Sequence, residues 1–231
     1  MKHMQPNLNL GVFASGGGTN FQSIIDNCET GTIDARVAVL ISDREDAGAR
    51  ERAARHGIPS HVVRVGKDLS DEFFAADRRH VEILREHDVD LVCLAGYMRR
   101  IGTAVLDGFP DAVLNIHPAI LPSFKGAHGQ RDAVDYGVRI SGATVHFADE
   151  EFDRGPIIIQ AAVPVTPDDT EETLAARILE QEHRIYPQAI QWFAEERLRI
   201  DDRRVILDPP SRGSYGSRDS AAIISPPLEF A

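Results

Sequence analysis

The stretch AVLNIHP, residues 112–118, places an amide and an imidazole two positions apart at the end of an apolar run. Alternate side chains of a β-strand point to the same side of the sheet. If the strand continues that far, Asn115 and His117 therefore face one side together. An amide donor next to a histidine can stabilise an oxyanion. The pair is our first candidate for catalytic chemistry.

A carboxylate downstream completes a possible set. Asp153 lies in the loop ADEEFDRGP, on a predicted turn before glycine and proline, from which it can reach His117. A carboxylate near an imidazole favours the imidazolium and raises the histidine pKa. Each residue also has a plain structural interpretation, because Asn115 can cap a loop, His117 can be a hydrogen-bonded loop histidine and Asp153 can be a turn residue.

Two further histidines lie in the same region. His146 alternates with Thr144 on a predicted strand, so it either reaches the same pocket or belongs to the core. The three histidines of this region, His117, His128 and His146, lack the close spacing of metal ligands. Neither HExxH nor CxxC occurs in the sequence. We therefore expect no metal.

A run of three glycines follows the first apolar segment, in ASGGGTNFQ (14–22). Glycines let the backbone approach a ligand closely, and the free N–H groups of a following helix suit a phosphate. The dinucleotide pattern would need a third glycine where Phe21 stands, and the Walker A pattern would need a lysine. The loop is thus neither an NAD nor an ATP motif, and the alternative to phosphate binding is a tight turn capped by Thr19.

The elements that must position these residues alternate between apolar strands and amphipathic helices. This rhythm predicts an α/β protein with an open, mostly parallel, Rossmann-like sheet and helices on both faces. Ligands of such sheets bind beyond the carboxyl ends of the strands. The predicted strands are 8–14, 35–42, 60–65, 90–96 and 112–116, and the predicted helices are 21–28, 47–56, 71–87 and 100–107.

The rhythm changes after residue 129. A short helix closed by Gly137 comes first, followed by two strands, 142–149 and 156–165, that we expect to be antiparallel. Asp169 with Glu172 predicts the start of a helix that runs to about residue 197. We expect one domain over 1–207 and an irregular tail over 208–231, which is rich in Pro, Ser and Gly.

Composition narrows the class of protein. The 231 residues carry a net charge of −11, which disfavours a nucleic-acid partner. No apolar run approaches the roughly 20 residues that cross a bilayer, and the first residues lack the apolar core of a secretory signal. The two cysteines, Cys28 and Cys93, lie in apolar patterns and are expected to be free thiols. These features indicate a cytoplasmic protein without a membrane partner.

Several segments together resemble the phosphoribosylglycinamide formyltransferase family of purine biosynthesis. They are FASGGGTN, LAGYMRRI, LNIHPAILPSFKGAHG, GATVHFADEEFDRGPIIIQ and ILEQEHRIYP, which follow in the family's order and spacing from about residue 8 to 207. The N-I-H-P and D-x-G-P elements are typical of the folate-dependent formyltransferase superfamily. The glycine loop and the Q-E-H-x-I-Y-P helix point to the phosphoribosylglycinamide branch and to the formyltransferase fold.

The resemblance implies a role for each matching residue. Asn115, His117 and Asp153 would be the catalytic trio, with His146 beside them. The glycinamide ribonucleotide, GAR, would be held by Gly18, Thr19 and Asn20 at its phosphate and by Glu182 at its ribose. The residues implied to bind 10-formyltetrahydrofolate, as co-substrate, are Leu94, Met98, Arg99, Arg100, Ile101, Asn115 and Asp71.

Three positions depart from the family's pattern. The family often has an arginine near Asp71, where it helps to bind folate, so that contact is doubtful here. Arg100 occupies a usually apolar position, and Arg154 replaces a small residue between Asp153 and Gly155. None of the three changes removes a catalytic group.

The resemblance implies direct transfer of a formyl group from 10-formyltetrahydrofolate to the amine of GAR, through a tetrahedral intermediate that Asn115 and His117 stabilise. Asp153 would raise the pKa of His117. The partners would be these two small molecules, with the chain a monomer or homodimer. The alternatives are a formyltetrahydrofolate deformylase, a methionyl-tRNA formyltransferase, for which residues 208–231 are too few to form the basic domain, and a catalytically silent binding module.

Overall fold

The computed structural model describes residues 8–210 and 222–230. The chain divides into two compact units, Met1–Leu114 and Asn115–Ala231, and each is described by itself. The boundary between them falls within β5 (Val113–His117). The single domain expected over 1–207 stays a prediction.

The N-terminal unit contains a parallel sheet in the order β3-β2-β1-β4. The inner strand β1 is fully buried at Leu10, Val12 and Phe13, as expected for a parallel sheet that is covered on both faces. The strands are β1 (Leu8–Phe13), β2 (Ala35–Ser42), β3 (Ser60–Val62) and β4 (Leu91–Leu94).

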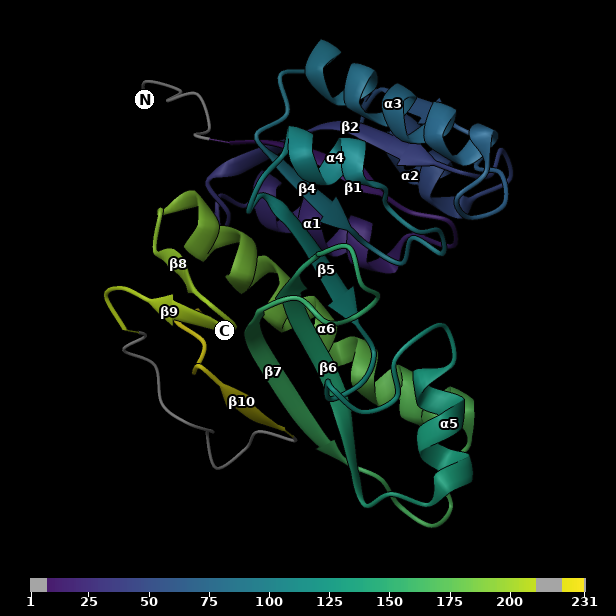
Figure 1. Ribbon diagram of the computed structural model, residues 1–231. Coiled ribbons are helices and arrows are strands. Elements are labelled where there is room, and N and C mark those ends of the chain that lie inside the picture. The colour runs from purple at the N-terminus through teal and green to yellow at the C-terminus, as the bar shows by residue number, and fades with distance from the viewer. Residues whose placement is uncertain (1–7, 211–221, 231) are drawn as a thin grey trace. The chain divides into compact units, whose positions relative to one another are not determined.

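The strand order determines where the helices of this unit pack. The connections β1–α1–β2 and β2–α2–β3 run one way along the sheet, whereas β3–α3–β4 returns to the other side of β1. Right-handed crossovers then place α1 and α2 on one face and α3 on the other, with α4 against α3 (Figure 1). The helices are α1 (Thr19–Glu29), α2 (Gly48–Arg55), α3 (Asp71–Glu86) and α4 (Thr103–Gly108).

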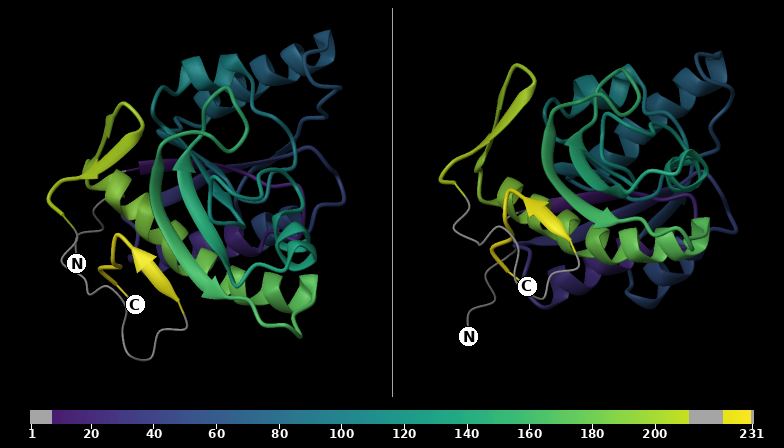
Figure 2. Two further views of the ribbon diagram at one scale, coloured as in Figure 1. Left: turned by 60° about the horizontal axis from the view of Figure 1, so that its bottom comes forward. Right: turned by 90° about the horizontal axis from the view of Figure 1, so that it is seen from below.

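The C-terminal unit is built on two long antiparallel strands, β6 (Ile140–Phe147) and β7 (Ile157–Pro164). Helix α6 (Glu171–Ala194) packs along both of them, and α5 (Gly129–Tyr136) packs on α6 (Figure 2). A capping box between Thr170 and Thr173 begins α6, one residue later than the Asp169 start that we expected. Parallel strands in the first unit and antiparallel strands in the second confirm the predicted fold class.

Three strands lie in segments where the sequence predicted none. A hairpin of β8 (Leu198–Asp201) and β9 (Arg204–Leu207) follows α6. In addition, β10 (Ile223–Ser225) pairs antiparallel with β7, so an irregular tail is the wrong description for this part of 208–231. Residues 211–221 of that segment lie outside the described residues.

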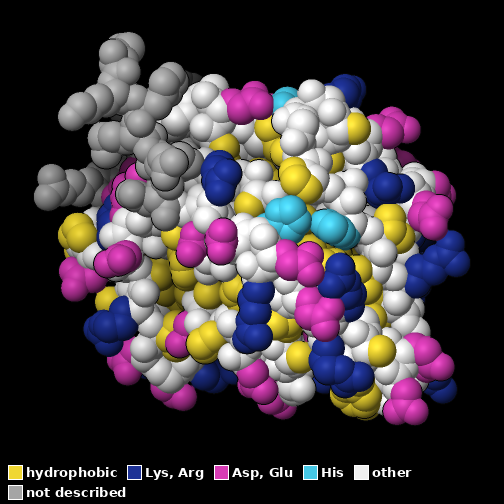
Figure 3. Space-filling model, turned by 90° about the horizontal axis from the view of Figure 1, so that it is seen from above, with side chains coloured by type: hydrophobic (Ala, Val, Ile, Leu, Met, Phe, Trp, Pro, Cys, Tyr) yellow, Lys and Arg dark blue, Asp and Glu magenta, His cyan; other side chains and the backbone are white. Residues whose placement is uncertain are grey.

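Two expectations from the composition, one on membrane-spanning helices and one on surface charge, can be compared with the structure. Within residues 8–210 and 222–230, no helix is both long and apolar enough to span a bilayer. On the face drawn in Figure 3, acidic and basic side chains are interspersed among the coloured residues, with no continuous basic patch there (Figure 3). The expectation that no nucleic acid binds stays a prediction.

Candidate active site

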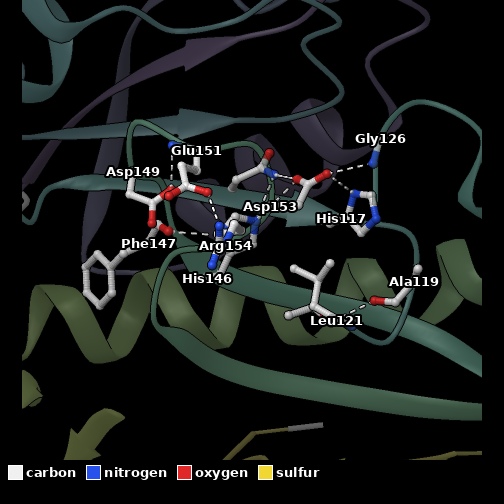
Figure 4. Close-up of polar contacts among 12 residues, drawn as sticks. His117, Ala119, Leu121, Gly126, His146, Phe147, Asp149, Glu151, Asp153 and Arg154 are labelled. Carbon is white, nitrogen blue, oxygen red and sulfur yellow. Dashed lines mark hydrogen bonds and ion pairs between the residues drawn. The ribbon is translucent and has the colours of Figure 1, made fainter. Parts of the chain in front are cut away.

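The two side chains at the end of β5 reach the same carboxylate. Asn115 Nδ2 lies 3.4 Å from Asp153 Oδ1, and His117 Nδ1 lies 3.5 Å from Asp153 Oδ2 (Figure 4). The side chains of His117 and Asp153 are only 5% and 7% exposed. The convergence of amide, imidazole and carboxylate is thus present within the C-terminal unit.

The turn that carries Asp153 is held in an unusual backbone conformation. Asp153 has a φ of 51°, in the left-handed region that non-glycine residues rarely adopt. The amide N–H of Gly126 donates to Asp153 Oδ2 over 2.8 Å and helps to hold the carboxylate. At Gly155 the chain passes so close to Phe147 that a Cβ would lie 1.7 Å from its carbonyl oxygen. Glycine at 155 is therefore required for this turn.

His146 joins the cluster from β6. The register of β6 against β7 shifts between Val145 and His146. His146 Nε2 lies 3.0 Å from Asn115 Nδ2 and 3.7 Å from Asp153 Oδ1. Of the two alternatives for His146, both apply, because the side chain is buried and also reaches the pocket residues.

Backbone carbonyls determine which ring nitrogens carry protons. His146 Nδ1 lies 2.8 Å from the carbonyl oxygen of Phe147, which can only accept, so Nδ1 is the donor. The Nε2 atom of neutral His146 then accepts from Asn115. Likewise, His117 Nε2 donates to the carbonyl oxygen of Phe124 over 2.8 Å, which leaves Nδ1 of neutral His117 facing Asp153 without a proton.

The pKa of His117 corrects one expectation from the sequence. Burial of the ring lowers this pKa, and the opposing effect of the Asp153 charge does not outweigh it, so the net direction is below the ordinary value. Asp153 acts in the predicted direction but does not hold His117 charged in the free protein. The reason is that the ring is almost completely removed from water.

The pKa of Asp153 is also set by opposing effects. Burial raises it, but the nearby imidazoles of His146 and His117 and the hydrogen bond from the Gly126 amide together lower it more. The net pKa lies below the usual value, so Asp153 is ionised at neutral pH. The cluster thus contains a buried carboxylate beside two imidazoles and an amide.

The segment after His117 is fastened to β6 by one threonine. Thr144 Oγ1 donates to the carbonyl oxygen of Ala119 over 2.7 Å and accepts from the Leu121 amide over 3.1 Å. Gln160 Nε2 donates to the same hydroxyl over 3.0 Å and to the Leu121 carbonyl over 3.0 Å. These bonds fix the loop that brings the Phe124 carbonyl to His117.

The glycine loop lies in the N-terminal unit and joins β1 to α1. Gly18, with a φ of 72°, is the N-cap residue of α1, and no side chain caps this helix. The alternative in which Thr19 caps the helix is therefore not observed. Gly16, Gly17 and Thr19 are exposed, so a ligand can reach the backbone there.

The predicted folate-binding residues 98–101 follow β4 in the same unit. Ser15 accepts from the Met98 amide over 2.9 Å, and its own amide donates to the Gly96 carbonyl over 3.1 Å. Arg99 Nε donates to Asp43 over 2.9 Å. The segment is thereby held to the end of β1 and to the residue after β2.

The remaining predicted residues differ in exposure. Met98 is 63% exposed, whereas Leu94 and Ile101 are buried. Asp71 is exposed in the first turn of α3, and Glu182 is buried on α6. Arg154, one of the three departures, pairs with Glu151 within its own loop (Figure 4).

Sequence reasoning missed the backbone groups of this site. The Phe124 carbonyl and the Gly126 amide are available from any residue type, so no sequence signal marks them. Thr144 had a usable signal, because it alternates with His146 on one strand. Among the described residues, no group of three or more His, Cys, Asp or Glu side chains is arranged to hold a metal ion.

Comparison with known proteins finds close relatives over most of the chain. The formyl transferase family model matches residues 8–190. The phosphoribosylglycinamide formyltransferase of Escherichia coli (strain K12) is 40% identical over 204 residues, which are 87% of this chain and 94% of that protein. The crystal structure of glycinamide ribonucleotide transformylase 1 from Symbiobacterium toebii is 49% identical with a TM-score of 0.83, covering 90% of this chain and 95% of that one.

A second kind of formyl-processing enzyme is similar at a lower level. The crystal structure of a formyltetrahydrofolate deformylase from Pseudomonas syringae pv. tomato is 26% identical, with a TM-score of 0.80. The match covers 87% of this chain and 65% of that one. The two enzyme classes therefore share a fold with this chain, and identity favours the transformylases.

Proposed function

Because the chain belongs to the formyl transferase family and, within it, to the phosphoribosylglycinamide formyltransferases of purine biosynthesis, we propose that Asn115, His117 and Asp153 carry out its formyl transfer. The donor is 10-formyltetrahydrofolate and the acceptor is the amine of GAR. The observation that supports this most is the buried Asp153 carboxylate, which Asn115, His117 and His146 approach together.

The reaction begins when the amine nitrogen of GAR attacks the formyl carbon. A C–N bond forms and the formyl oxygen becomes an oxyanion. Asn115 Nδ2 has two protons: the bond to His146 orients the amide at 3.0 Å, and the longer contact with Asp153, at 3.4 Å, is the one that the oxyanion replaces. Preorganised donors of this kind need no reorientation when the charge develops.

His117 supplies the second stabilising group once it is protonated. The free protein favours the neutral ring because of burial. A developing oxyanion adds a second negative charge beside that of Asp153, and both favour the imidazolium. His117 thus becomes charged at the stage of the reaction that requires the charge, by holding the proton that leaves the attacking amine until the intermediate collapses.

A proton must pass from the attacking amine to N10 of the folate, whose bond to the formyl carbon breaks as the intermediate collapses. Asp153 is the base for this transfer, because its lowered pKa keeps it ionised, and a water molecule can relay the proton. No metal and no covalent enzyme intermediate is needed. Proximity of the two bound substrates supplies the rest of the rate enhancement.

Substrate binding follows the residues that match the family. Gly18, Thr19 and Asn20 hold the phosphate of GAR, and Glu182 binds its ribose hydroxyls. The folate residues are Leu94, Met98, Arg99, Arg100 and Ile101, together with Asn115, while Asp71 is a weak contributor because it is an acid where the family often has an arginine. A cytoplasmic location and a monomeric or homodimeric state stay predictions.

The test is acceptor dependence. The purified protein is mixed with 10-formyltetrahydrofolate in the presence and absence of GAR, and release of tetrahydrofolate is followed together with formation of formyl-GAR. We expect stoichiometric release of both products only when GAR is present. Loss of the formyl group at the same rate without GAR would identify a deformylase and contradict the proposal.

A further inference from the structure

The carbonyl groups of the three loop glycines, Gly16, Gly17 and Gly18, all accept hydrogen bonds. The Gly16 carbonyl accepts from the Ala49 amide over 3.1 Å, and the Gly18 carbonyl accepts from the Gln22 amide over 2.9 Å. The Gly17 carbonyl accepts from Arg52 Nε over 2.7 Å. Two of these three donors are backbone amides of α1 and α2, and only the third is a side chain.

These bonds determine where the amides of the loop point. In a trans peptide the N–H lies opposite the carbonyl of the same peptide plane. Because the carbonyls of residues 16–18 face α1 and α2, the N–H groups of Gly17, Gly18 and Thr19 face away from those partners. None of these three N–H groups has a hydrogen-bond partner in residues 8–210 and 222–230. Successive amides that point outward form an anion-binding cradle.

Arg52 is itself held in place by a chain of polar contacts. Its Nη1 donates to Gln22 Oε1 over 3.2 Å. The amide group of Gln22 is fixed from its other end, because Nε2 donates to Asp26 over 2.8 Å and lies 3.1 Å from His56 Nε2. Two donors of the guanidinium, Nε and Nη1, are therefore bonded to two different acceptors, the Gly17 carbonyl and the Gln22 side chain.

Close packing keeps the loop within reach of Arg52. A Cβ at Gly18 would lie 2.7 Å from the Cβ of Ala49, and one at Gly48 would lie 3.3 Å from the Cα of Gly17. Helix α2 thus presses directly on the loop through small residues. Arg52, one turn into α2, therefore lies within hydrogen-bond distance of the Gly17 carbonyl.

We propose that Arg52 is a positioning residue for the phosphate of the acceptor: it holds the peptide between Gly17 and Gly18 so that the Gly18 N–H points at the anion. It acts through the Gly17 carbonyl and not by touching the phosphate. The identity of the anion rests on the proposed function, whereas the orientation of the loop does not.

The experiment compares Arg52→Met and Arg52→Lys with the wild-type protein. The substrates are GAR and the same compound without its phosphate, and binding of inorganic phosphate is titrated in parallel. Loss of a hydrogen bond to a charged group predicts a rise of about tenfold in KM for GAR and in the Kd for phosphate. The value of kcat/KM for the unphosphorylated acceptor is expected to stay at the wild-type level.

The Arg52→Lys variant tests whether the shape of the guanidinium or only its positive charge matters. It keeps the positive charge but lacks the planar fork, so Arg52→Lys is expected to fail as Arg52→Met does. The matched control is Arg55→Met, which removes the same charge from an exposed position of the same helix. We expect this variant to keep the wild-type KM for GAR and for the unphosphorylated acceptor. Gln22→Leu, which keeps Arg52 but removes its orienting acceptor, is expected to raise KM for GAR by a smaller factor and serves if the Arg52 variants do not fold.

Two results would overturn the positioning role. One is a wild-type KM in Arg52→Lys, which would show that charge alone matters. The other is an equal loss with the unphosphorylated acceptor, which would show a general defect. Failure of the proposed function is distinct, because the wild-type protein would then show no GAR-dependent turnover while the phosphate titration still reports on Arg52.

Discussion

Burial and charge compete at His117. Removal of the ring from water favours the neutral form, while the Asp153 carboxylate 3.5 Å away favours the charged form. Burial prevails in the free protein, so His117 is poised to gain a proton only when further negative charge arrives. A histidine that changes charge during the reaction stabilises the intermediate more than the ground state.

Replacing the carboxylate tests this balance. In Asp153→Asn the anion that favours imidazolium is gone, so we expect the pKa of His117, followed by NMR titration, to fall below its wild-type value. We expect kcat to fall by about 100-fold, since a proton-transfer group is lost. The control is Asp149→Asn, in the same loop, whose carboxylate accepts a hydrogen bond from the Glu151 amide. An unchanged His117 pKa in Asp153→Asn would contradict the account.

At this scale the sequence predicted the side chains and missed their backbone partners. Asn115, His117 and Asp153 were recognisable because each is a polar residue at the end of an apolar run or on a turn. The net pKa of His117 was not predictable, since it depends on burial that only the folded loops create. The same holds for the Phe124 carbonyl, whose position depends on Thr144.

Among the elements, the end of β1 connects two functional loops of the N-terminal unit. Ser15 is buried and directly precedes the glycine loop, and it bonds to Gly96 and Met98 through its amide and hydroxyl. A shift of Ser15 therefore moves both the glycine loop, which we propose binds phosphate, and the predicted folate segment. On that proposal Ser15 supports the binding of both substrates.

Ser15→Ala removes the acceptor of the Met98 amide. A net hydrogen-bond contribution of about 1 kcal/mol predicts a rise of roughly fivefold in KM for both substrates, measured by steady-state kinetics. The control is Ser70→Ala, which removes a comparable hydroxyl acceptor, that of the Phe73 amide, at the start of α3. We expect Ser70→Ala to lower stability to a similar extent without changing either KM. Equal KM changes in the two variants would mean that Ser15 has only a structural role.

Most elements were predictable and three were not. Apolar runs located β1 to β7 to within a few residues. The hairpin β8–β9 and strand β10 are only three or four residues long, and none of these strands contains consecutive buried residues, so no apolar run marks them in the sequence. Strand β10 exists because β7 offers it an edge, which is a tertiary effect that local sequence does not report.

For the whole molecule, the C-terminal segment is fastened to α6 by side chains and to β7 by strand β10. Glu229 accepts from Arg197 through both carboxylate oxygens and from Trp192 Nε1, and its amide donates to Gln188. Residues far apart in the sequence therefore hold the C-terminal segment against the end of α6.

The whole chain carries a net charge of −11, which does not favour anionic substrates. Local donors, such as the amides of the glycine loop, must therefore provide the binding of such substrates.

The central claim is that the cluster around Asp153 performs the formyl transfer, and that Asn115 in this cluster contributes far more to the reaction than to folding stability. The most direct measurement is kcat/KM of Asn115→Ala in the GAR-dependent assay, with the melting temperature of the same sample. Loss of one oxyanion donor predicts a fall of about 100- to 1000-fold. The melting temperature is expected to change by no more than about 4 °C, which roughly 1 kcal/mol produces in a chain of this size.

Asn27→Ala is the matched control, since it removes an amide that donates to the Ser23 carbonyl within α1. We expect this variant to keep wild-type kcat/KM. If Asn115→Ala also retained activity within about threefold of the wild-type protein, a loss well below that of an oxyanion donor, the assignment of the catalytic site would be wrong.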